Sequence, residues 1–308
     1  MALGRTRSAA ARLYSAAVSL AARTPLPPPP TDAAEAERRL RDVLRPLGGG
    51  VVTLSGGVDS ALVLTVAAQE WPKGRCVAVT NRSDSLADRE LEDCRAQVAA
   101  AGAEHVLLPG HELDVDAFRR NAPDRCFHCK DTLYAGALEV ARARGLAWVV
   151  DGTNADDLGD HRPGLAAVER HGVRSPLLEA GLRKPWVRAV AKALGLPWWD
   201  KPADACLSSR FPYGTEITRE GLARVAAAER VVKDLGFRVV RVRVHDPIAR
   251  VEVPVEDVPA LLSPGLRERV VEGIKALGFT YVTLDLEGFR SGSMNEPLRA
   301  PARSAEPR

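Results

Sequence analysis

Five cysteines stand in the 308-residue chain, and three of them lie where a thiol could do chemistry. Cys126 and Cys129 form a Cys-x-x-Cys pair, whose thiolates can reach one metal centre. Such a pair beside strands and helices is also typical of a redox motif, but that motif follows the first strand and this pair does not. Cys206 lies in a polar stretch, where burial has no obvious purpose. Cys76 in a predicted strand and Cys94 in a predicted helix are expected to be packed thiols.

A glycine-rich turn is the second candidate for chemistry. It follows the short apolar run 51–54 and precedes an apolar run typical of a helix. Adjacent glycines let main-chain N–H groups approach an anion, and the positive end of the following helix points at the same place. The turn lacks the lysine of a Walker loop and the glycine spacing of a dinucleotide fold. We therefore predict a phosphate site of another kind, formed by Ser55, Gly56, Gly57, Asp59 and Ser60.

Composition limits the class of protein. The apolar and charged fractions are those of a globular domain, and the formal net charge of +3 is too small to indicate a nucleic-acid binder. No stretch approaches the ~18 apolar residues of a transmembrane helix, so no membrane partner is expected. An odd number of cysteines in a chain of this length argues against a disulfide framework and predicts a reducing, cytoplasmic location.

The two ends of the chain differ from the rest. Residues 1–31 contain no Asp or Glu, are rich in Ala, Ser and Arg, and include a polyproline run near their end. This composition is typical of an organelle transit peptide, which would place the protein in an organelle; we favour a disordered extension. Residues 291–308 are expected to form a flexible tail.

Strands alternate with helices in the first predicted domain, residues 32–214. Right-handed crossovers at this spacing predict an α/β fold with a parallel, doubly wound sheet covered on both faces. Ligands of such sheets bind beyond the carboxyl ends of the strands, so four loops should meet at one site. The predicted strands are 51–54, 76–80, 105–108 and 148–150, the helices include 33–47 (capped by Thr31 or Asp32), 88–101 and 130–144, and the loops are 55–60, 80–86, 121–130 and 151–162.

A smaller α+β domain is predicted for residues 215–290. Its pattern indicates a helix from Thr218, which would cap it, to residue 235, and strands at 238–244, 250–253 and 279–284. Strand alternation places Arg241, Arg243 and His245 on one face. Neighbouring guanidiniums repel unless an anion or carboxylates lie between them, so spacing alone leaves an anion site and a solvated face with Glu partners equally open.

The motifs together resemble the LarE family of the ATP pyrophosphatase (PP-loop) superfamily. The similarity runs from about residue 35 to 295 and rests on five stretches: 55–60 (SGGVDS), 121–130 (NAPDRCFHCK), 151–157 (DGTNADD), 205–214 (ACLSSRFPYG) and 284–295 (LDLEGFRSGSMN). Members are ATP-dependent sulfur transferases that adenylate a carboxylate of pyridinium-3,5-biscarboxylate mononucleotide. They convert it to a thiocarboxylate for the nickel-pincer cofactor of lactate racemase.

This resemblance implies ligands and roles for individual residues. The ATP and pyrophosphate site would comprise Ser55, Gly56, Gly57, Asp59, Ser60, Arg82, Ser83 and Gly152. Mg²⁺ would be bound by Asp59, with Asp156 as a weaker candidate. From their place at the end of a predicted strand, Asp151 and Asp156 could each bind Mg²⁺ or a ribose or simply form the loop. The phosphate of the mononucleotide would be bound by Ser209, Arg210, Arg241 and Arg243. Assembly as a homo-oligomer, often a hexamer, is also implied.

The resemblance leaves two sources for the sulfur. In many members the cysteine at the position of Cys206 gives up its own sulfur and becomes dehydroalanine. Other members have three cysteines, matching Cys126, Cys129 and Cys206, that hold a [4Fe–4S] cluster whose fourth iron is open for an exogenous sulfide. Since a cubane usually takes four thiolates, three leave one iron free, and a sulfide bound there can be replaced after each turnover. We favour the cluster over a sacrificial Cys206.

Other functions of the same fold remain to be weighed. A tRNA-thiolating relative usually has additional zinc-binding cysteine pairs or an RNA-binding domain, neither of which is evident here, and the low net charge disfavours tRNA. An amide-forming synthetase of the NAD or GMP synthetase type would not need the cysteines. A non-enzymatic nucleotide-binding module would not need an intact SGGVDS loop.

Overall fold

The computed structural model describes residues 26–159 and 163–296, and these fall into two compact units. The first unit ends at Asp204 and the second begins at Ala205, whereas the sequence placed the boundary after Gly214. The stretch after Ala205 belongs with the second unit because Arg210 forms a buried ion pair with Glu229 of that unit. Most of the predicted extension and tail, 1–25 and 297–308, lies outside the described residues.

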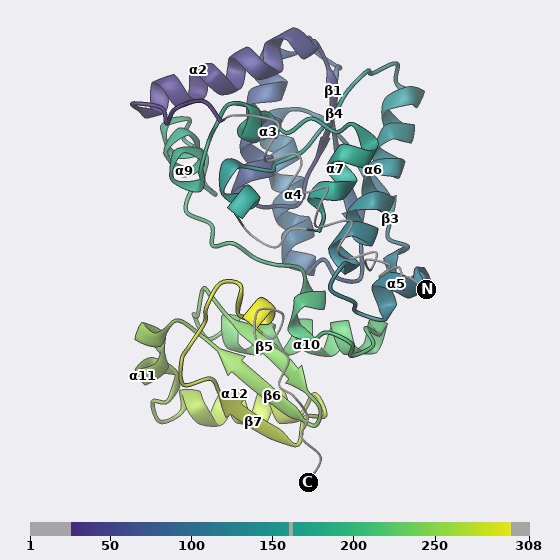
Figure 1. Ribbon diagram of the computed structural model, residues 1–308. Coiled ribbons are helices and arrows are strands. Elements are labelled where there is room, and N and C mark those ends of the chain that lie inside the picture. The colour runs from purple at the N-terminus through teal and green to yellow at the C-terminus, as the bar shows by residue number, and fades with distance from the viewer. Residues whose placement is uncertain (1–25, 160–162, 297–308) are drawn as a thin grey trace, which may run out of the picture. The chain divides into compact units, whose positions relative to one another are not determined.

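A four-stranded parallel sheet forms the centre of the first unit (Figure 1). Its strands are paired in the order β3-β2-β1-β4. Val51 of β1 lies opposite Val77 of β2 on one side and Val149 of β4 on the other. The parallel sheet and its helices confirm the predicted α/β class. The strands are β1 (Gly50–Thr53), β2 (Cys76–Arg82), β3 (Glu104–Pro109) and β4 (Val149–Val150).

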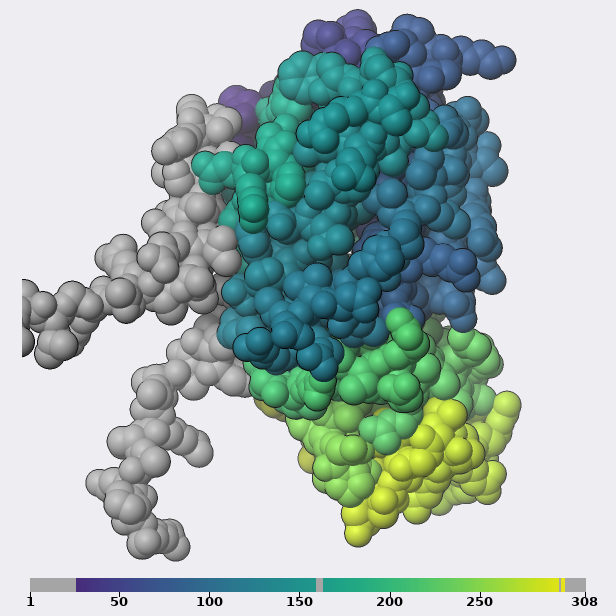
Figure 2. Space-filling view, turned by 90° about the vertical axis from the view of Figure 1, so that its right-hand side faces the viewer, coloured from purple at the N-terminus to yellow at the C-terminus, as the bar shows by residue number. Residues whose placement is uncertain are grey.

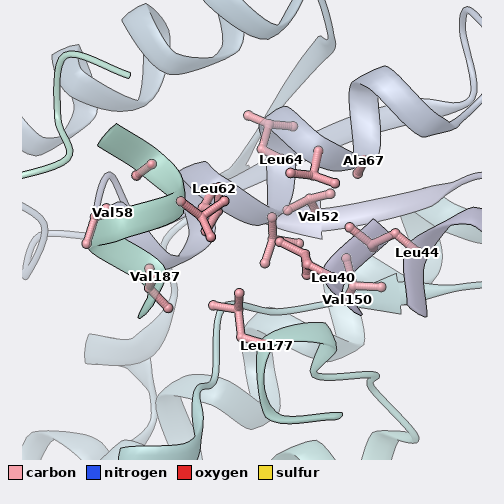
Figure 3. Close-up of a cluster of buried hydrophobic side chains, with 14 of the residues drawn as sticks. Leu40, Leu44, Val52, Val58, Leu62, Leu64, Ala67, Val150, Leu177 and Val187 are labelled. Atoms are coloured by element: carbon pink, nitrogen blue, oxygen red, sulfur yellow. The ribbon is translucent and has the colours of Figure 1, made fainter. Parts of the chain in front are cut away.

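Helices cover both faces of this sheet because successive strand residues point to opposite sides. Val52 packs in a cluster with α2, α3 and α9, part of which Figure 3 shows. Its neighbour Val51 packs with α6 and α7, which contribute to the teal surface in Figure 2. The helices of this unit are α2 (Ala33–Leu44), α3 (Val58–Glu70), α4 (Asp88–Ala101), α5 (Asp116–Arg119), α6 (Arg125–Ala143), α7 (Leu165–His171), α8 (Pro176–Glu179) and α9 (Lys184–Ala193).

Helix starts test the capping predictions. The Asp32 carboxylate accepts the Glu35 N–H at 2.7 Å, as expected of an N-cap. Helix α6 begins at Arg125 rather than Lys130, so the prediction of a loop over 121–130 was wrong at its second half. The Cys-x-x-Cys pair therefore lies within the first five residues of a helix.

The second unit is built on a three-stranded mixed sheet in the order β5-β6-β7. Strands β5 and β6 are antiparallel, whereas β6 and β7 are parallel. The predicted cap of its first helix is confirmed, since the Thr218 hydroxyl accepts the Gly221 N–H at 3.0 Å. The elements are α10 (Arg219–Lys233), β5 (Arg241–His245), β6 (Ile248–Glu252), α11 (Val258–Leu261), α12 (Leu266–Lys275) and β7 (Tyr281–Leu284). Across both units, none of the helices in the described part of the chain is long and apolar enough to span a bilayer.

Candidate active site

The glycine-rich turn connects β1 to α3, as predicted. Gly56 has φ +77°, a left-handed conformation that favours glycine, whereas Gly57 has φ −78° and is the N-cap of α3. Ser60 lies in the first turn of α3, where its hydroxyl accepts the Ser55 N–H at 3.2 Å. The turn thus brings the free N–H groups of a 13-residue helix to the end of a buried strand. Such an N-terminus favours an anion such as phosphate.

Close packing fixes the position of this turn. A Cβ on Gly56 would lie 2.9 Å from the Glu90 carbonyl oxygen of α4, and a Cβ on Gly152 would lie 2.7 Å from the Ser60 nitrogen. The Gly56 carbonyl accepts hydrogen bonds from Gln97 Nε2 and from Lys201 Nζ, each at 2.9 Å. Since only hydrogen atoms fit at these glycines, the loop, α4 and the end of β4 form one rigid assembly.

Asp59 forms an ion pair with a lysine that sequence reasoning missed. Its carboxylate contacts Lys184 Nζ and accepts a hydrogen bond from Asn154 Nδ2 at 3.3 Å. Lys184 is the first residue of α9, a position where a positive charge opposes the helix dipole. Two basic residues in a row, Arg183 and Lys184, immediately before Pro185 were the signal in the sequence that an anion lies nearby.

Asp156, the weaker candidate for Mg²⁺, is engaged with the same helix. One of its oxygens accepts from Arg183 NH1 at 2.7 Å and the other from the Lys184 N–H at 2.8 Å. Asp156 thus accepts hydrogen bonds from the N-cap residue and the first residue of α9, although it is not itself a residue of that helix. Its proposed role as a metal ligand stays a prediction.

Asp151 is buried at the end of β4 and both of its oxygens are in use. They accept the hydroxyls of Tyr134 (2.7 Å), Thr153 (2.6 Å) and Ser175 (2.7 Å) and the Thr153 N–H (3.0 Å). Burial favours a higher pKa for Asp151, but the Lys130 ammonium 3.6 Å away and these hydrogen bonds together hold its pKa below the usual value. This network joins α6 to the end of β4, which suits an anchor better than a ligand site.

The end of β2 and the loop after it contain two more residues that were predicted for the ATP site, Arg82 and Ser83. The hydroxyl of Ser83 accepts the Ser85 N–H at 2.9 Å, while Arg82 is exposed. Beneath them lies Glu112, buried and hydrogen-bonded by Asn81 at 3.3 Å and Ser85 at 3.4 Å. Burial raises the pKa of Glu112. This carboxyl, which sequence reasoning did not single out, holds the end of β2 and the loop after it in place through these two hydrogen bonds.

The three candidate cysteines are the accessible ones. Cys126 is exposed and Cys129 partly exposed, and their i, i+3 spacing in α6 puts them on one side of the helix. Cys206 is exposed at the start of a short 3-10 turn in the second unit. The first two thus belong to one unit and the third to the other. Over residues 26–159 and 163–296 no three metal-ligating side chains are grouped closely enough to hold a metal ion.

We expect alkylation to separate the two classes of cysteine. Burial raises the pKa of Cys76 to about 12 and that of Cys94 to about 11. Because the thiolate is the reactive form, both buried thiols should be almost wholly protonated and unreactive at pH 8, and burial blocks access as well. Iodoacetamide at pH 8, followed by peptide mass spectrometry of metal-free protein, should modify Cys126, Cys129 and Cys206 but reach the other two only in urea. Labelling of Cys76 in the native protein would contradict this.

Two arginines of the second unit, Arg210 and Arg243, are buried in ion pairs with glutamates. Arg210, 1% exposed, binds Glu229 through Nε at 2.6 Å. Its NH1 donates to the carbonyls of Ala205 at 2.7 Å and Cys206 at 3.2 Å. Arg210 therefore also fixes the backbone that presents the Cys206 thiol.

The strand arginines show the same pattern. Arg243 donates to both carboxylate oxygens of Glu252, at 3.0 and 2.9 Å, and to the Ser209 carbonyl at 2.8 Å. Arg241 is buried and stacks over Phe289, with its guanidinium carbon 4.9 Å from the ring centroid. Of the two interpretations left open by the spacing, a glutamate partner is present for Arg243, but the two arginines are buried and only His245 of the predicted face is exposed. Binding of a substrate phosphate stays a prediction for Ser209 and these arginines.

Comparison with known proteins decides the family. An uncharacterised protein of Synechocystis sp. is 44% identical over 259 residues, which cover 84% of this chain and 96% of the relative. The pyridinium-3,5-bisthiocarboxylic acid mononucleotide synthase of Lactiplantibacillus plantarum is 41% identical over 258 residues, 83% of this chain and 92% of that enzyme. The chain belongs to the LarE family. Comparison with models of protein families finds no match.

Membership of the LarE family makes this chain an ATP-dependent sulfur-transferring enzyme. A tRNA-specific 2-thiouridylase of Caulobacter vibrioides is also similar, with 29% identity over 213 residues that cover 55% of each protein. That similarity is consistent with a shared PP-loop domain. Because the match to LarE proteins extends over most of the chain, the predicted tRNA-thiolating and amide-forming alternatives are not favoured.

Proposed function

We propose that this enzyme adenylates a carboxylate of pyridinium-3,5-biscarboxylate mononucleotide and converts it to a thiocarboxylate. A carboxylate oxygen attacks the α-phosphorus of ATP and pyrophosphate leaves; a sulfur nucleophile then attacks the acyl carbon and AMP leaves. The observation that supports this most strongly is the 41% identity to the bisthiocarboxylic acid mononucleotide synthase over 92% of that enzyme. The thiocarboxylate would serve synthesis of a nickel-pincer cofactor.

The residues of the loop have separate roles in this proposal. The N–H groups at the start of α3 and the hydroxyls of Ser55 and Ser60 bind the leaving pyrophosphate. Asp59 positions the pyrophosphate with Mg²⁺. Gly152 packs closely against the backbone of Ser60 and so fixes the position of the start of α3. Arg82 and Ser83 lie on the adenine side. Binding the phosphates at a helix N-terminus stabilises the charge that develops on pyrophosphate as it leaves.

For the sulfur route we propose that Cys126, Cys129 and Cys206 hold a [4Fe–4S] cluster. The donor type fits, since all three thiols are at least partly exposed and the first two share one side of α6. When bound, such a cluster would supply an open iron site for an exogenous sulfide. Iron and acid-labile sulfide in anaerobically purified protein test this route. A colourless protein in which Cys206 becomes dehydroalanine during turnover would show the sacrificial route instead.

One assay tests the whole proposal. Protein, Mg²⁺, ATP and sulfide are incubated anaerobically with the biscarboxylate mononucleotide, with unmodified tRNA, or with ammonia and a carboxylate acceptor of the NAD synthetase type. We expect pyrophosphate, AMP and a thiolated product only with the biscarboxylate mononucleotide. Thiolated tRNA or an amide product would contradict the proposed substrate.

Arg243 is predicted to bind the phosphate of the mononucleotide. Replacement by alanine would remove one of the cations that neutralise the buried Glu252, and could destabilise the fold. The informative variant is therefore Arg243→Lys, which keeps the positive charge but loses the planar set of guanidinium N–H donors. We expect the KM of the mononucleotide to rise about 10-fold and that of ATP to change by less than about twofold. Steady-state kinetics with each substrate varied in turn measures both.

The matched control is Arg250→Lys on β6. Arg250 donates to the same glutamate, with NH2 2.9 Å from Glu252 Oε1, but is not among the predicted phosphate ligands. Equal rises in KM for the two variants would mean that the effect passes through Glu252, and would contradict a phosphate contact of Arg243.

A further inference from the structure

The start of α9 presents a positive charge to the glycine-rich loop. Lys184 is the first residue of this helix, and its ammonium forms an ion pair with Asp59 in the first turn of α3. The side chain of Lys184 is 29% exposed, so the ion pair is open to solvent on one side. Two helix N-termini therefore meet here, one with a carboxylate and one with an ammonium.

Helix electrostatics treats these two charges differently. A carboxylate in the first turn of α3 is favoured by the helix dipole, whereas an ammonium at the first position of α9 is disfavoured by the dipole of its own helix. Arg183, the N-cap of α9, adds a second positive charge at the same end. Such an arrangement is stable only with anions close by, and a polyphosphate at the loop would bring several.

Asp156 holds Lys184 in this position. Its carboxylate accepts the Lys184 N–H at 2.8 Å and bonds Arg183 NH1 at 2.7 Å, which ties the first residues of α9 to the segment that follows β4. Asp156 thus offsets part of the positive charge and fixes the backbone from which the Lys184 side chain extends. The side chain itself stays free to change partners.

Lys201 shows what a purely structural lysine looks like beside the same loop. Its ammonium donates to the Gly56 carbonyl at 2.9 Å and to the Asp93 carboxylate at 2.5 Å, which ties the loop to α4. Within the described residues, the Lys184 ammonium has one acidic partner, Asp59. An ammonium has three N–H donors, so Lys184 retains donors for phosphate oxygens.

We propose that Lys184 is a phosphate-binding residue of the ATP site, positioned by Asp156, which exchanges the carboxylate of Asp59 for polyphosphate oxygens when ATP binds. Release of Asp59 would leave that carboxylate available for Mg²⁺. The inference rests on the proposed binding of ATP at residues 55–60, and it adds a residue that binds the β- or γ-phosphate.

Calorimetric binding of ATP, pyrophosphate and AMP to Lys184→Met tests this. We expect the affinities for ATP and pyrophosphate to fall about 10- to 100-fold and that for AMP to change by less than about threefold. A role in folding alone would not separate pyrophosphate from AMP. Lys192→Met is the control, because Lys192 lies on the same helix with its ammonium 4.6 Å from the Trp199 ring centroid. It should leave all three affinities unchanged.

The outcomes separate this inference from the proposed function. Suppose that wild-type protein binds ATP and that Lys184→Met binds ATP and pyrophosphate as tightly as wild type does. The proposed role of Lys184 is then wrong, whereas the proposed function is not contradicted. If wild-type protein binds neither ATP nor pyrophosphate, both are wrong.

Chemical modification of the wild-type protein tests the same proposal without requiring any variant to fold. Acetylation of Lys184 by an N-hydroxysuccinimide ester should slow when pyrophosphate is added, while acetylation of Lys192 should not change. Equal rates at Lys184 with and without pyrophosphate would overturn the proposal.

Discussion

Replacing Cys206 by alanine is expected to abolish formation of the thiocarboxylate and to leave release of pyrophosphate intact. Both sulfur routes need this thiol, either as the sulfur that is given up or as a ligand of the cluster. Loss of the group that forms or delivers the nucleophile typically costs on the order of a thousandfold or more. Adenylation depends on the loop at 55–60 in the other unit, so pyrophosphate release should stay within about twofold of wild type.

The Cys206 thiol is exposed, so the substitution leaves no cavity. Stability should therefore change by less than about 0.5 kcal/mol. Arg210 binds the backbone carbonyl of residue 206 rather than its side chain, which preserves the local turn. Thiolated product is followed by mass spectrometry and pyrophosphate by a coupled assay. The control, Cys76→Ala, removes a buried thiol at the first residue of β2, which the proposed chemistry does not use, and should keep full sulfur transfer per folded molecule.

Two outcomes would contradict the prediction. Wild-type levels of thiolated product from Cys206→Ala would exclude this cysteine from both routes. Loss of pyrophosphate release together with sulfur transfer would show that Cys206 acts in adenylation. Cys126→Ala then separates the routes: the cluster requires it, whereas a sacrificial Cys206 would still give one turnover without it.

The sequence predicted the parts of the fold that depend on local pattern. The loop of residues 55–60 between a strand and a helix was found because glycine, a buried strand and apolar periodicity all lie within a few positions. The start of α6 was missed because the Cys-x-x-Cys motif was interpreted as a loop. Pro123 and Asp124 directly before Arg125 are typical of a helix start and were the better guide.

Long-range contacts of the candidate site could not be predicted in the same way. Alternation along β5 placed the arginines on one face, but it does not reveal that Glu252 of β6 forms a buried ion pair with Arg243, or that Glu229 of α10 binds Arg210 and the Val242 N–H. Lys184 and Asp59 are likewise distant in sequence and meet only through the fold. In each case the missing information was the partner, which depends on how helices pack on a sheet and not on local periodicity.

The second large effect is expected at Gly56. Replacement by alanine puts a side chain on a residue with φ +77°, which costs about 1–2 kcal/mol, and its Cβ would lie 2.9 Å from the Glu90 carbonyl oxygen. The Glu90 carbonyl belongs to the backbone of α4, which cannot move aside as the end of a flexible side chain can. The close contact with the new Cβ therefore adds about 1–3 kcal/mol. We expect a loss of roughly 2–5 kcal/mol in total, visible as a fall in the melting temperature of roughly 4–20 °C.

Gly57→Ala is the matched control, one residue away in the same loop. Gly57 has φ −78°, and the nearest atom to its added Cβ would be Ser55 Oγ at 3.6 Å, an ordinary contact. Alanine is a poorer N-cap than glycine, so this variant should lose less than about 1 kcal/mol. In Gly56→Ala the displaced loop should also lower kcat/KM for ATP by about 100-fold or more, because misplacement by about 1 Å is enough for that. Equal melting temperatures for the two variants would mean that Gly56 is not held against α4. Close packing of the loop on that helix would then not explain how the phosphates are positioned.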